Sequence, residues 1–401
     1  MAGAARVDAA NDVGPEPSRA PPDAAAIAVE VHDDAGAFER LGPEWNALSE
    51  SAGNACAFLD LEWHRTWWAV YARPADRLHL VAFRLDGELV GLLPLYARRL
   101  AGPVGPARLR FVGTGETRGE EVVTEYADAL ARDDAARAVG DVALAHLTRF
   151  ARWRSVELRC LLEGSVLLDA LRRHEPAHAL VRDAGRRYRV DLAGGEAAHF
   201  ARLGPGRVRR IERSRRAVAR DGGFERVSPV RPEDVDAAFE TLARLHENRQ
   251  RRLGRRRGAF AAERFARFHR TLVHALLPGG AADVEVWRIG GEPVAALHLY
   301  ARGETLHYYQ SGFAGRGANR WMPLTLAHLE RMASAREAGV RWYDLMRGES
   351  PCYKDDFGCE TTPMHTALLF ASGAGLRLEA WRRAASAHAR RTLARLGLRE
   401  P

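Results

Sequence analysis

A short apolar run leads directly into a crowded polar loop in the segment Trp342-Tyr343-Asp344-Leu345-Met346-Arg347-Gly348-Glu349-Ser350-Pro351-Cys352-Tyr353-Lys354. An apolar run that ends at Gly, Ser and Pro is typical of a buried β-strand followed by a loop. In α/β proteins, loops at the carboxyl ends of strands often carry binding and catalytic groups. This loop mixes acidic and basic side chains, and a similar polar segment precedes it at residues 308–313. We therefore interpret the segment as part of a functional site; the alternative is a solvated loop after an ordinary strand.

The length and composition predict a globular protein with more than one domain. At roughly 150 residues per domain, the 401 residues suggest two or three domains. An apolar fraction of 46% is sufficient for sizeable cores. No apolar run reaches the roughly 18 residues that a membrane span needs. Residues 1–26 are rich in Ala, Pro and Asp and lack an apolar core segment, so we expect a disordered tail and a cytoplasmic location.

The cysteines do not suggest a disulfide framework. There are four of them, at positions 56, 160, 352 and 359, too few and too scattered for such a pattern. Cys352 and Cys359 lie near His365 in the sequence, but their spacing does not match a zinc site. We therefore expect free thiols and no bound metal.

The positive charge is concentrated in two arginine-rich segments. The net charge of +8 comes from 60 basic and 52 acidic residues, and arginines gather at residues 207–220 and 249–257. A guanidinium group can hold two oxygens of a phosphate or carboxylate at once. Nucleic acid, a nucleotide cofactor, or an anionic carbohydrate or lipid are therefore admissible partners. Specific nucleic-acid recognition is the weaker interpretation, because neither segment interleaves aromatic residues and no zinc-finger or RNP-like motif occurs.

Two blocks of the sequence share one order of predicted elements. In the first, strands at 78–85 and 88–96 flank Asp86-Gly87, a pair that favours a tight type I′ turn. In the second, strands at 284–289 and 292–300 flank Gly290-Gly291. A third strand, a helix and a fourth strand follow each hairpin, at 109–112, about 134–150 and 155–158, and then at 306–309, about 323–337 and 340–345. Such an internal repeat predicts a duplicated domain.

This order of elements, with a basic glycine-containing loop before the helix, resembles the GNAT acyltransferase fold. The tandem arrangement is similar to the FemAB-like branch and to bacterial acetyltransferases of the cellulose-biosynthesis type. The resemblance covers roughly residues 27–370. It is carried by the basic helix at 204–214, the strand at 308–313, and an Asp, Gly and Tyr-Lys signature at 343–349 and 353–354. It implies an α/β (α+β) fold of two tandem GNAT-like domains, each with a mixed, mostly antiparallel sheet flanked by helices.

The resemblance implies four segments. These are a tail at 1–26, a first domain at 27–190, a second domain with the active cleft at 191–370, and a basic C-terminal helix at 371–401. In the first domain, the loop at 113–121 is acidic where a pyrophosphate-binding loop should be basic, so it would repel phosphates. We therefore expect the first domain to bind the acceptor or to act as scaffold.

The resemblance also implies that acetyl-CoA or another acyl-CoA is the co-substrate. In this fold, backbone N–H groups and the dipole at a helix N-terminus favour the pyrophosphate anion. Pro323 suits the first turn of that helix, since its missing N–H would be unpaired there anyway. The loop before it meets the family pattern only in part, and a flexible loop with incidental arginines is the alternative. The candidate donor-binding residues are Ser311, Gly315, Arg316, Gly317, Asn319 and Arg320.

Acyl transfer to an amine requires a neutral amine, a stabilised oxyanion and a proton for the leaving group. Lys354 is the candidate for oxyanion stabilisation, and Tyr353 or Tyr309 for proton donation. Asp344 or Glu349 could orient or deprotonate the acceptor amine. The acceptor-binding candidates are Arg209, Arg213, His246, Arg249 and Arg347. Hydrolase and kinase interpretations lack support, because no catalytic triad spacing, HExxH or P-loop occurs.

The expected function is transfer of an acetyl group from acetyl-CoA to an amine or hydroxyl. A small-molecule or glycan acceptor linked to the cell envelope or an exopolysaccharide is expected. One alternative is a FemAB-like transferase that uses aminoacyl-tRNA, which the arginine-rich segments could accommodate. A second alternative is an inactive GNAT-like module that binds an anionic partner.

Overall fold

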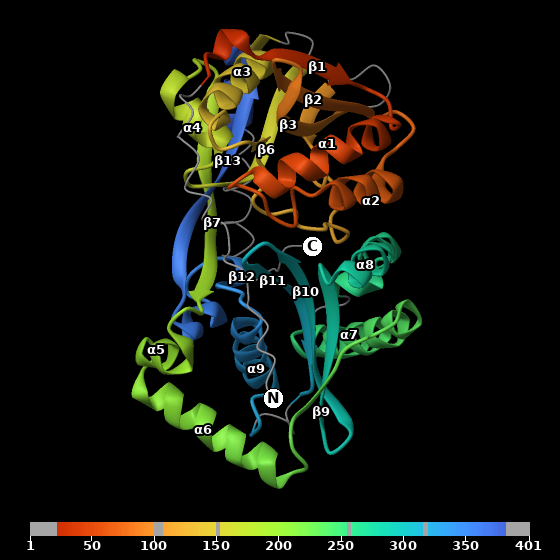
Figure 1. The fold of residues 1–401 in the computed structure, drawn as a ribbon, viewed down its shortest axis with the longest axis vertical. Helices are drawn as coiled ribbons and strands as arrows, with labels where there is room; N and C mark the ends of the chain where they lie inside the picture. The colour runs from red at the N-terminus through yellow and green to blue at the C-terminus, as the bar shows by residue number, and fades with distance from the viewer. Residues whose placement is uncertain (1–21, 100–106, 150–152, 255–257, 316–319, 382–401) are drawn as a thin grey trace, which may run out of the picture.

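One continuous sheet runs through the whole molecule. The computed structural model describes residues 22–99, 107–149, 153–254, 258–315 and 320–381. Its strands follow the order β1-β2-β3-β4-β6-β13-β7-β12-β11-β10-β9-β8, and β5 (Leu130–Ala131) pairs with β3. Figure 1 shows the two halves of the chain at opposite ends of the long axis, with helices packed beside the sheet. The predicted α/β fold with a mixed sheet is confirmed.

The first half contains the predicted hairpin and the helix that follows it. Asp86 and Gly87 have φ angles of 51° and 85°, as a type I′ turn requires, and β4 and β6 run parallel beside α3. The elements are a 3-10 turn (Ala24–Ala26), β1 (Ala28–His32), α1 (Ala37–Ser51), α2 (Leu61–Tyr71), β2 (Arg77–Leu85), β3 (Glu88–Arg99), β4 (Ala107–Phe111), α3 (Ala136–Arg149), β6 (Trp153–Leu162) and α4 (Val166–His174).

The second half repeats the same order of helices and strands. Two helices, an antiparallel hairpin, a third strand, a helix and a parallel strand occur in each half, which confirms the tandem arrangement. The elements are α5 (Gly195–Ala201), α6 (Pro205–Arg220), β8 (Glu225–Val227), α7 (Pro232–Arg252), a 3-10 turn (Ala259–Ala261), α8 (Glu263–Leu276), a 3-10 turn (Leu277–Gly279), β9 (Ala282–Ile289), β10 (Glu292–Arg302), β11 (Thr305–Phe313), α9 (Pro323–Glu337), β12 (Trp342–Gly348) and a 3-10 helix (Tyr353–Phe357).

Two long strands join the halves. β7 (Ala179–Asp191) and β13 (Glu360–Phe370) pair antiparallel, and Figure 1 shows them running between the two ends of the molecule. β13 also pairs with β6, and its Ala367 and Leu369 are buried in the core of the first half. The expected boundary at residues 190 and 191 falls at the end of β7, but β13 completes the sheet of the first half. Residues 373–381 are helical, whereas 1–21 and 382–401 lie outside the described residues.

A shared core lies between the halves. It includes side chains of α1 and α2 from the first half and of α7 and α8 from the second. The ring of Trp63 lies 5.0 Å from that of Phe268 and 5.5 Å from that of Tyr300, both in edge-on arrangements that aromatic pairs favour. Each half also has a core of its own, around α3 and α9 respectively. Burial of these rings stabilises one relative arrangement of the halves.

None of the helices within the described residues is long and apolar enough to cross a membrane. In the same residues, no group of three or more His, Cys, Asp and Glu side chains could hold a metal ion. The four cysteines have free thiols.

Candidate functional site

The strands β11 and β12 separate partway along their length. They pair in parallel only where Thr305–His307 lies beside Trp342–Asp344. Beyond this point, β11 has a bulge against β10, and a bulge bends a strand. At the separated end, the N–H of Ser311 donates to Oε1 of Gln310 over 3.0 Å, so it faces the opening instead of β10. The opening therefore exposes a strand edge with backbone groups that a substrate could contact.

A cavity of about 360 Å³ lies at this separated end. The end of β11, the first turn of α9 and the 3-10 helix after β12 form its walls, together with side chains of α6 and α7. Met322 has a left-handed conformation and Pro323 begins α9, and no side chain caps the helix among the described residues. Leu324 and Thr325 line the cavity, so the first-turn amides and the helix dipole favour an anion there. We call this the donor cavity.

Arginines surround the donor cavity. Arg207 and Arg210 reach it from α6, and Arg249 reaches it from α7. Arg207 pairs with Asp356 at 3.1 Å, and the guanidinium of Arg249 lies 5.0 Å from the ring of Phe313. In the part of the chain that the structure describes, no carboxylate pairs with Arg210 or Arg249. The cavity therefore has an excess of positive charge that suits phosphate groups.

A larger cavity of about 780 Å³ lies between the two halves. The segment 258–263, which connects α7 and α8, lines it together with side chains of α7, β11 and β12. From the first half come the loop at 113–124 and two residues of β6. We call this the acceptor cavity. Its charged lining residues are of both signs, namely Glu116, Glu120, Glu121, Glu263, Arg118, Arg159 and Arg347.

His246 lies in the acceptor cavity, directly beside the opening between the strands. Its side chain is buried, and Nδ1 lies 2.9 Å from the carbonyl oxygen of Ser311. Because a carbonyl only accepts hydrogen bonds, Nδ1 carries the hydrogen and Nε2 is left as an acceptor. Gln250, 3.3 Å from Nε2, donates to it. A Cβ at Gly312 would lie 2.4 Å from the His246 backbone nitrogen, so only glycine allows α7 to approach this closely. This geometry suits a general base.

A strained segment of the first half contacts both separated strands. The Tyr309 hydroxyl donates to the carbonyl of Val122. The Arg347 N–H donates to Glu125 over 2.6 Å, and the Tyr126 hydroxyl donates to Asp344 over 2.9 Å. Within this segment, Val123 and Tyr126 have φ angles of 43° and 56°.

Left-handed backbone is costly for such residues, and for a β-branched valine above all. Strain of this kind is often found at functional sites. The segment 122–126 also separates two cavities between the halves. Val123 and Thr124 line the acceptor cavity, whereas Tyr126 lines a second one.

Three of the predicted catalytic residues occupy different surroundings. Tyr353 lines the donor cavity; the residue is 40% exposed, while burial of its hydroxyl raises the pKa above the ordinary value. Tyr309 lies in the shared core, with its ring 4.4 Å from that of His269, and lines neither cavity. Glu349 is exposed on the surface after β12 and also lines neither cavity. Of these three residues, Tyr353 alone lines the donor cavity.

Lys354 and Asp344 are both buried beneath the site. The Lys354 ammonium group donates to the Arg347 carbonyl and lines neither the donor nor the acceptor cavity. Burial lowers the pKa of Lys354, and the nearby carboxylates of Glu125 and Asp344 oppose this effect. Asp344 accepts from Tyr126 and lines the second cavity between the halves. Direct contact of either residue with the reacting groups stays a prediction.

Replacing Lys354 with methionine separates a structural role from a catalytic one. If Lys354 only supports Arg347, the change removes a charged donor from a partly buried carbonyl and should lower the free energy of unfolding by about 1–3 kcal/mol. Turnover at saturating substrate should then change little. If Lys354 stabilises the oxyanion, kcat should fall by about two to three orders of magnitude. Denaturant unfolding and steady-state kinetics on the same preparation decide between these results.

The predicted donor-binding residues lie at or beside the opening. The hydroxyl of Ser311 is buried and lies 2.6 Å from that of Tyr308. Gly315 lies against the side chain of Arg252, where a Cβ would overlap it. Arg320 is exposed and pairs with Asp221 at 3.0 Å, at the C-terminal end of α6. Arg316, Gly317 and Asn319 lie outside the described residues.

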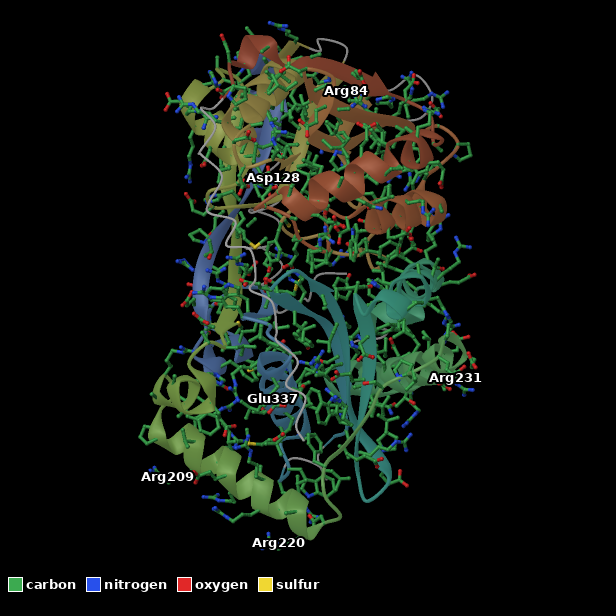
Figure 2. All side chains as sticks on the ribbon, in the orientation of Figure 1. Arg84, Asp128, Arg209, Arg220, Arg231 and Glu337 are labelled. Carbon is green, nitrogen blue, oxygen red and sulfur yellow. The ribbon has the colours of Figure 1, made fainter. Side chains whose placement is uncertain are left out.

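The predicted acceptor-binding residues divide among three places. His246 and Arg347 line the acceptor cavity, and Arg249 lines the donor cavity. Arg209 and Arg213 are exposed on α6, and Figure 2 shows Arg209 on the outer side of this helix. The sequence interpretation missed Arg207 and Arg210, which line the donor cavity.

A signal for the position of Arg207 was available in the sequence. Arg207 precedes Ile211 by four positions and Ser214 by seven, and both of these residues are buried. On a helix these spacings place all three on one face. That face, and not the one through Arg209 and Arg213, points into the molecule.

Protonation of the Glu125 carboxyl makes the free energy of unfolding depend on pH. Burial raises the pKa of Glu125 to about 7, from 4.5. The folded protein therefore holds this proton over a range where the unfolded chain has released it, so stability falls as the pH rises from about 4.5 to about 7.

Glu125→Gln removes this titration and can still accept from the Arg347 N–H. Relative to the parent, its free energy of unfolding should be similar near pH 4.5 and higher by about 1–3 kcal/mol near pH 8. The exposed Glu349→Gln is the control. A difference from the parent that does not vary with pH would contradict this account, and denaturant titrations at several pH values provide the measurement.

Comparison with known families agrees with this geometry. Residues 205–355 match the family model described as an acetyltransferase (GNAT) domain. The matched residues lie within the second half of the chain. The match covers α6 to the start of the 3-10 helix after β12, and so includes most of the donor cavity and the second-half side of the acceptor cavity. No curated protein sequence matches the chain significantly.

Solved structures share the fold over both halves. FemX superposes with a TM-score of 0.58 at 11% identity, covering 82% of this chain and 96% of FemX. A protein of unknown function from Bacteroides thetaiotaomicron gives 0.54 at 9% identity, covering 85% and 100%. The L-PGS structure from Bacillus licheniformis gives 0.50 at 10% identity, covering 82% and 92%. At these identities the likeness shows the fold, and the expected tandem GNAT fold is confirmed.

Proposed function

We propose that this chain is an acyltransferase that moves an acyl group, most simply acetyl from acetyl-CoA, to an amine. The observation that carries the proposal is the donor cavity. Three arginines converge there on the uncapped first turn of a helix, beside two separated strands. In the GNAT fold this is where the pyrophosphate of acyl-CoA is expected to bind. A cytoplasmic location belongs to the same proposal, because that is where acyl-CoA would be available.

The acyl group would lie along the exposed edge of β11. The Ser311 N–H faces the opening and now donates to the side chain of Gln310. An acyl carbonyl in the place of the Gln310 oxygen would accept this hydrogen bond, which becomes stronger as negative charge develops on that oxygen. The phosphates would lie toward Arg207, Arg210 and Arg249 in the donor cavity. This orientation directs the thioester toward His246 and the acceptor cavity.

His246 and Tyr353 support the two proton transfers that the reaction needs. As the acceptor nitrogen attacks the thioester carbon, the amine would replace the Gln250 amide at Nε2 of His246, which can then take the proton that the amine loses. When the carbon–sulfur bond breaks, the departing thiolate needs a proton. A tyrosine hydroxyl is protonated at neutral pH, and Tyr353 lines the donor cavity. The base is thus on the acceptor side and the acid on the donor side.

The acceptor cavity suits an amine that also carries polar or anionic groups. Carboxylates from the first-half loop and Glu263 can hold an ammonium group, while Arg159 and Arg347 can hold a carboxylate or phosphate. A volume of about 780 Å³ is within the range of sites for small metabolites. An amino sugar of an envelope or exopolysaccharide precursor fits these conditions. An O-acyl acceptor is possible at the same site, since a hydroxyl needs the same base.

The second candidate is an aminoacyl-tRNA-dependent transferase of the FemAB-like kind. Its support is that α6 borders the donor cavity through Arg207 and Arg210 and has an outer face of exposed arginines. Figure 2 shows Arg209 and Arg220 on that outer side. A polyanion bound there would show an affinity that falls steeply with salt, because counterions are released on binding.

Release of free thiol from acetyl-CoA in the presence of amino sugars and simple amines tests the proposal. Turnover that requires an amine is the expected result. Transfer of a labelled amino acid from charged tRNA, without any thiol release from acetyl-CoA, would favour the second candidate. Calorimetric binding of coenzyme A without turnover on any acceptor would instead fit an inactive binding module.

A further inference from the structure

A second cavity between the halves has no part in the proposed reaction. It has a volume of about 660 Å³ and lies on the other side of the segment 122–126 from the acceptor cavity. Tyr126 and Asp344 line it, whereas Thr124 and Arg347 line the acceptor cavity. We call it the reverse cavity.

The reverse cavity occupies an equivalent place in the duplicated unit. The segment 52–56, which connects α1 and α2, lines the reverse cavity as the segment 258–263 between α7 and α8 lines the acceptor cavity. In each half the two helices precede the antiparallel hairpin. A duplicated domain thus presents a cavity beside the same connection in both copies.

Three arginines, Arg187, Arg189 and Arg302, line the reverse cavity together with five carboxylates, of which Glu50 and Glu304 are exposed to solvent. Arg187 and Arg189 are two positions apart on β7, so they extend from the same face of the sheet. Arg189 lies over the ring of Trp342 at 3.6 Å and is 3.7 Å from Glu360. Arg187 lies 5.6 Å from the ring of Tyr126, and its buried Nε has no hydrogen-bond partner. Burial, and then the charge of Arg187, lower the pKa of Arg189, so a bound anion would relieve repulsion between them.

His307 lines the same cavity with an unsatisfied ring. Its side chain is 3% exposed, and neither ring nitrogen has a hydrogen-bond partner. The nearest carboxylate oxygen, Oδ2 of Asp344, is 3.5 Å from Nδ1. Buried polar groups are usually hydrogen-bonded, so a ring without partners that faces a cavity points to a ligand.

The three carboxylates of this cavity that are not exposed already have other partners. Asp344 accepts from the Tyr126 hydroxyl and the Met346 N–H. Asp128 accepts from two amides in the first turn of α4, over 2.7 and 3.0 Å. Glu163 pairs with Arg172 and His365. In the lining of this cavity, Nε of Arg187, Nε of Arg189, the Ser165 hydroxyl and both ring nitrogens of His307 are buried without a hydrogen-bond partner. Arg189 already contacts Glu360 and Trp342, so Arg187 and His307 are the groups that a ligand would satisfy.

We propose that the reverse cavity binds a small metabolite through an anionic group, a carboxylate or a phosphate, held by Arg187 and His307. Arg302, which lies 3.4 Å from Asp60, borders the same cavity and can contact a second polar group of the ligand. The volume is that of a metabolite site and not of a single ion. This site stands independently of the proposed acyl transfer.

Calorimetric titration of the full chain with inorganic phosphate, and separately with succinate, tests the site. At least one anion should bind with a dissociation constant below about 10 mM. Arg187→Gln should weaken that binding by at least about tenfold. Arg186 is exposed and lies one position away on β7. Arg186→Gln removes the same charge and should change the dissociation constant of the anion less than about twofold. If Arg187→Gln weakens the binding of phosphate alone, the ligand group is a phosphate. If it weakens the binding of succinate alone, the ligand group is a carboxylate.

Phosphate could also bind in the donor cavity, so Arg210→Ala is titrated in parallel. Binding that Arg210→Ala abolishes and Arg187→Gln leaves intact would overturn the proposal. Absence of binding for both anions would overturn it as well. Thermal unfolding establishes that each variant is folded without reference to catalysis, and His307→Gln replaces Arg187→Gln in the titration if the latter does not fold.

Discussion

Replacing His246 with glutamine is expected to lower kcat by about two to four orders of magnitude, the usual contribution of a positioned general base. The glutamine amide can still donate to the Ser311 carbonyl, which His246 contacts over 2.9 Å, so the packing of α7 on β11 is retained. What the variant loses is the accepting Nε2. Coenzyme A affinity should change little, because the donor cavity is lined by other residues.

The pH dependence distinguishes a base from a merely structural histidine. In the parent, kcat should rise with pH as the imidazole becomes neutral and then level off. His246→Gln should remove this rise of kcat with pH. It should leave a slow rate that increases only as more acceptor amine becomes neutral. His274→Gln, on a partly exposed position of α8, is the matched control and should keep the parent profile. An unchanged kcat in His246→Gln would refute the assignment of the base.

Local signals were sufficient to predict much of the fold. Asp-Gly and Gly-Gly pairs set the two hairpins, because positive φ angles at Gly87 and Gly291 need residues that tolerate them. Pro323 marked the start of α9 correctly, since a proline is favoured in the first turn. Each of these features depends on a few adjacent residues. The same is true of the repeat, which follows from the order of such features along the chain.

Features that depend on distant partners could not be predicted. The sequence of β13, residues 360–370, contains nothing to show that this strand pairs with β6 of the first half. The contacts of Glu125 and Tyr126 with β12 join residues more than 200 positions apart. Lys354 follows a loop-like segment in the sequence, yet it folds back beneath β12 to the Arg347 carbonyl. The segment was correctly singled out, but which side chains face a cavity depends on the packing of both halves.

The donor cavity provides the second large effect, through Arg210 and Arg249. Replacing both with alanine should weaken coenzyme A binding by about 3–6 kcal/mol, or roughly two to four orders of magnitude, if each guanidinium makes one charged hydrogen bond to a phosphate. Neither has a carboxylate partner within the described residues, so neither truncation leaves a buried acid unpaired there. Isothermal titration gives the affinity, and the single variants should each account for part of the loss.

Arg209→Ala is the control that separates a specific site from general positive charge. Arg209 is adjacent to Arg210 on α6, is exposed on the outer side of the helix (Figure 2), and carries the same charge. Loss of a screened surface charge should change the affinity by less than about threefold at physiological salt. Equal weakening by Arg209→Ala and Arg210→Ala would contradict the donor cavity and indicate diffuse electrostatic attraction by α6. Weakening by Arg210→Ala alone, persisting at high salt, would locate the phosphates at the first turn of α9, because direct charged hydrogen bonds are screened far less than long-range attraction.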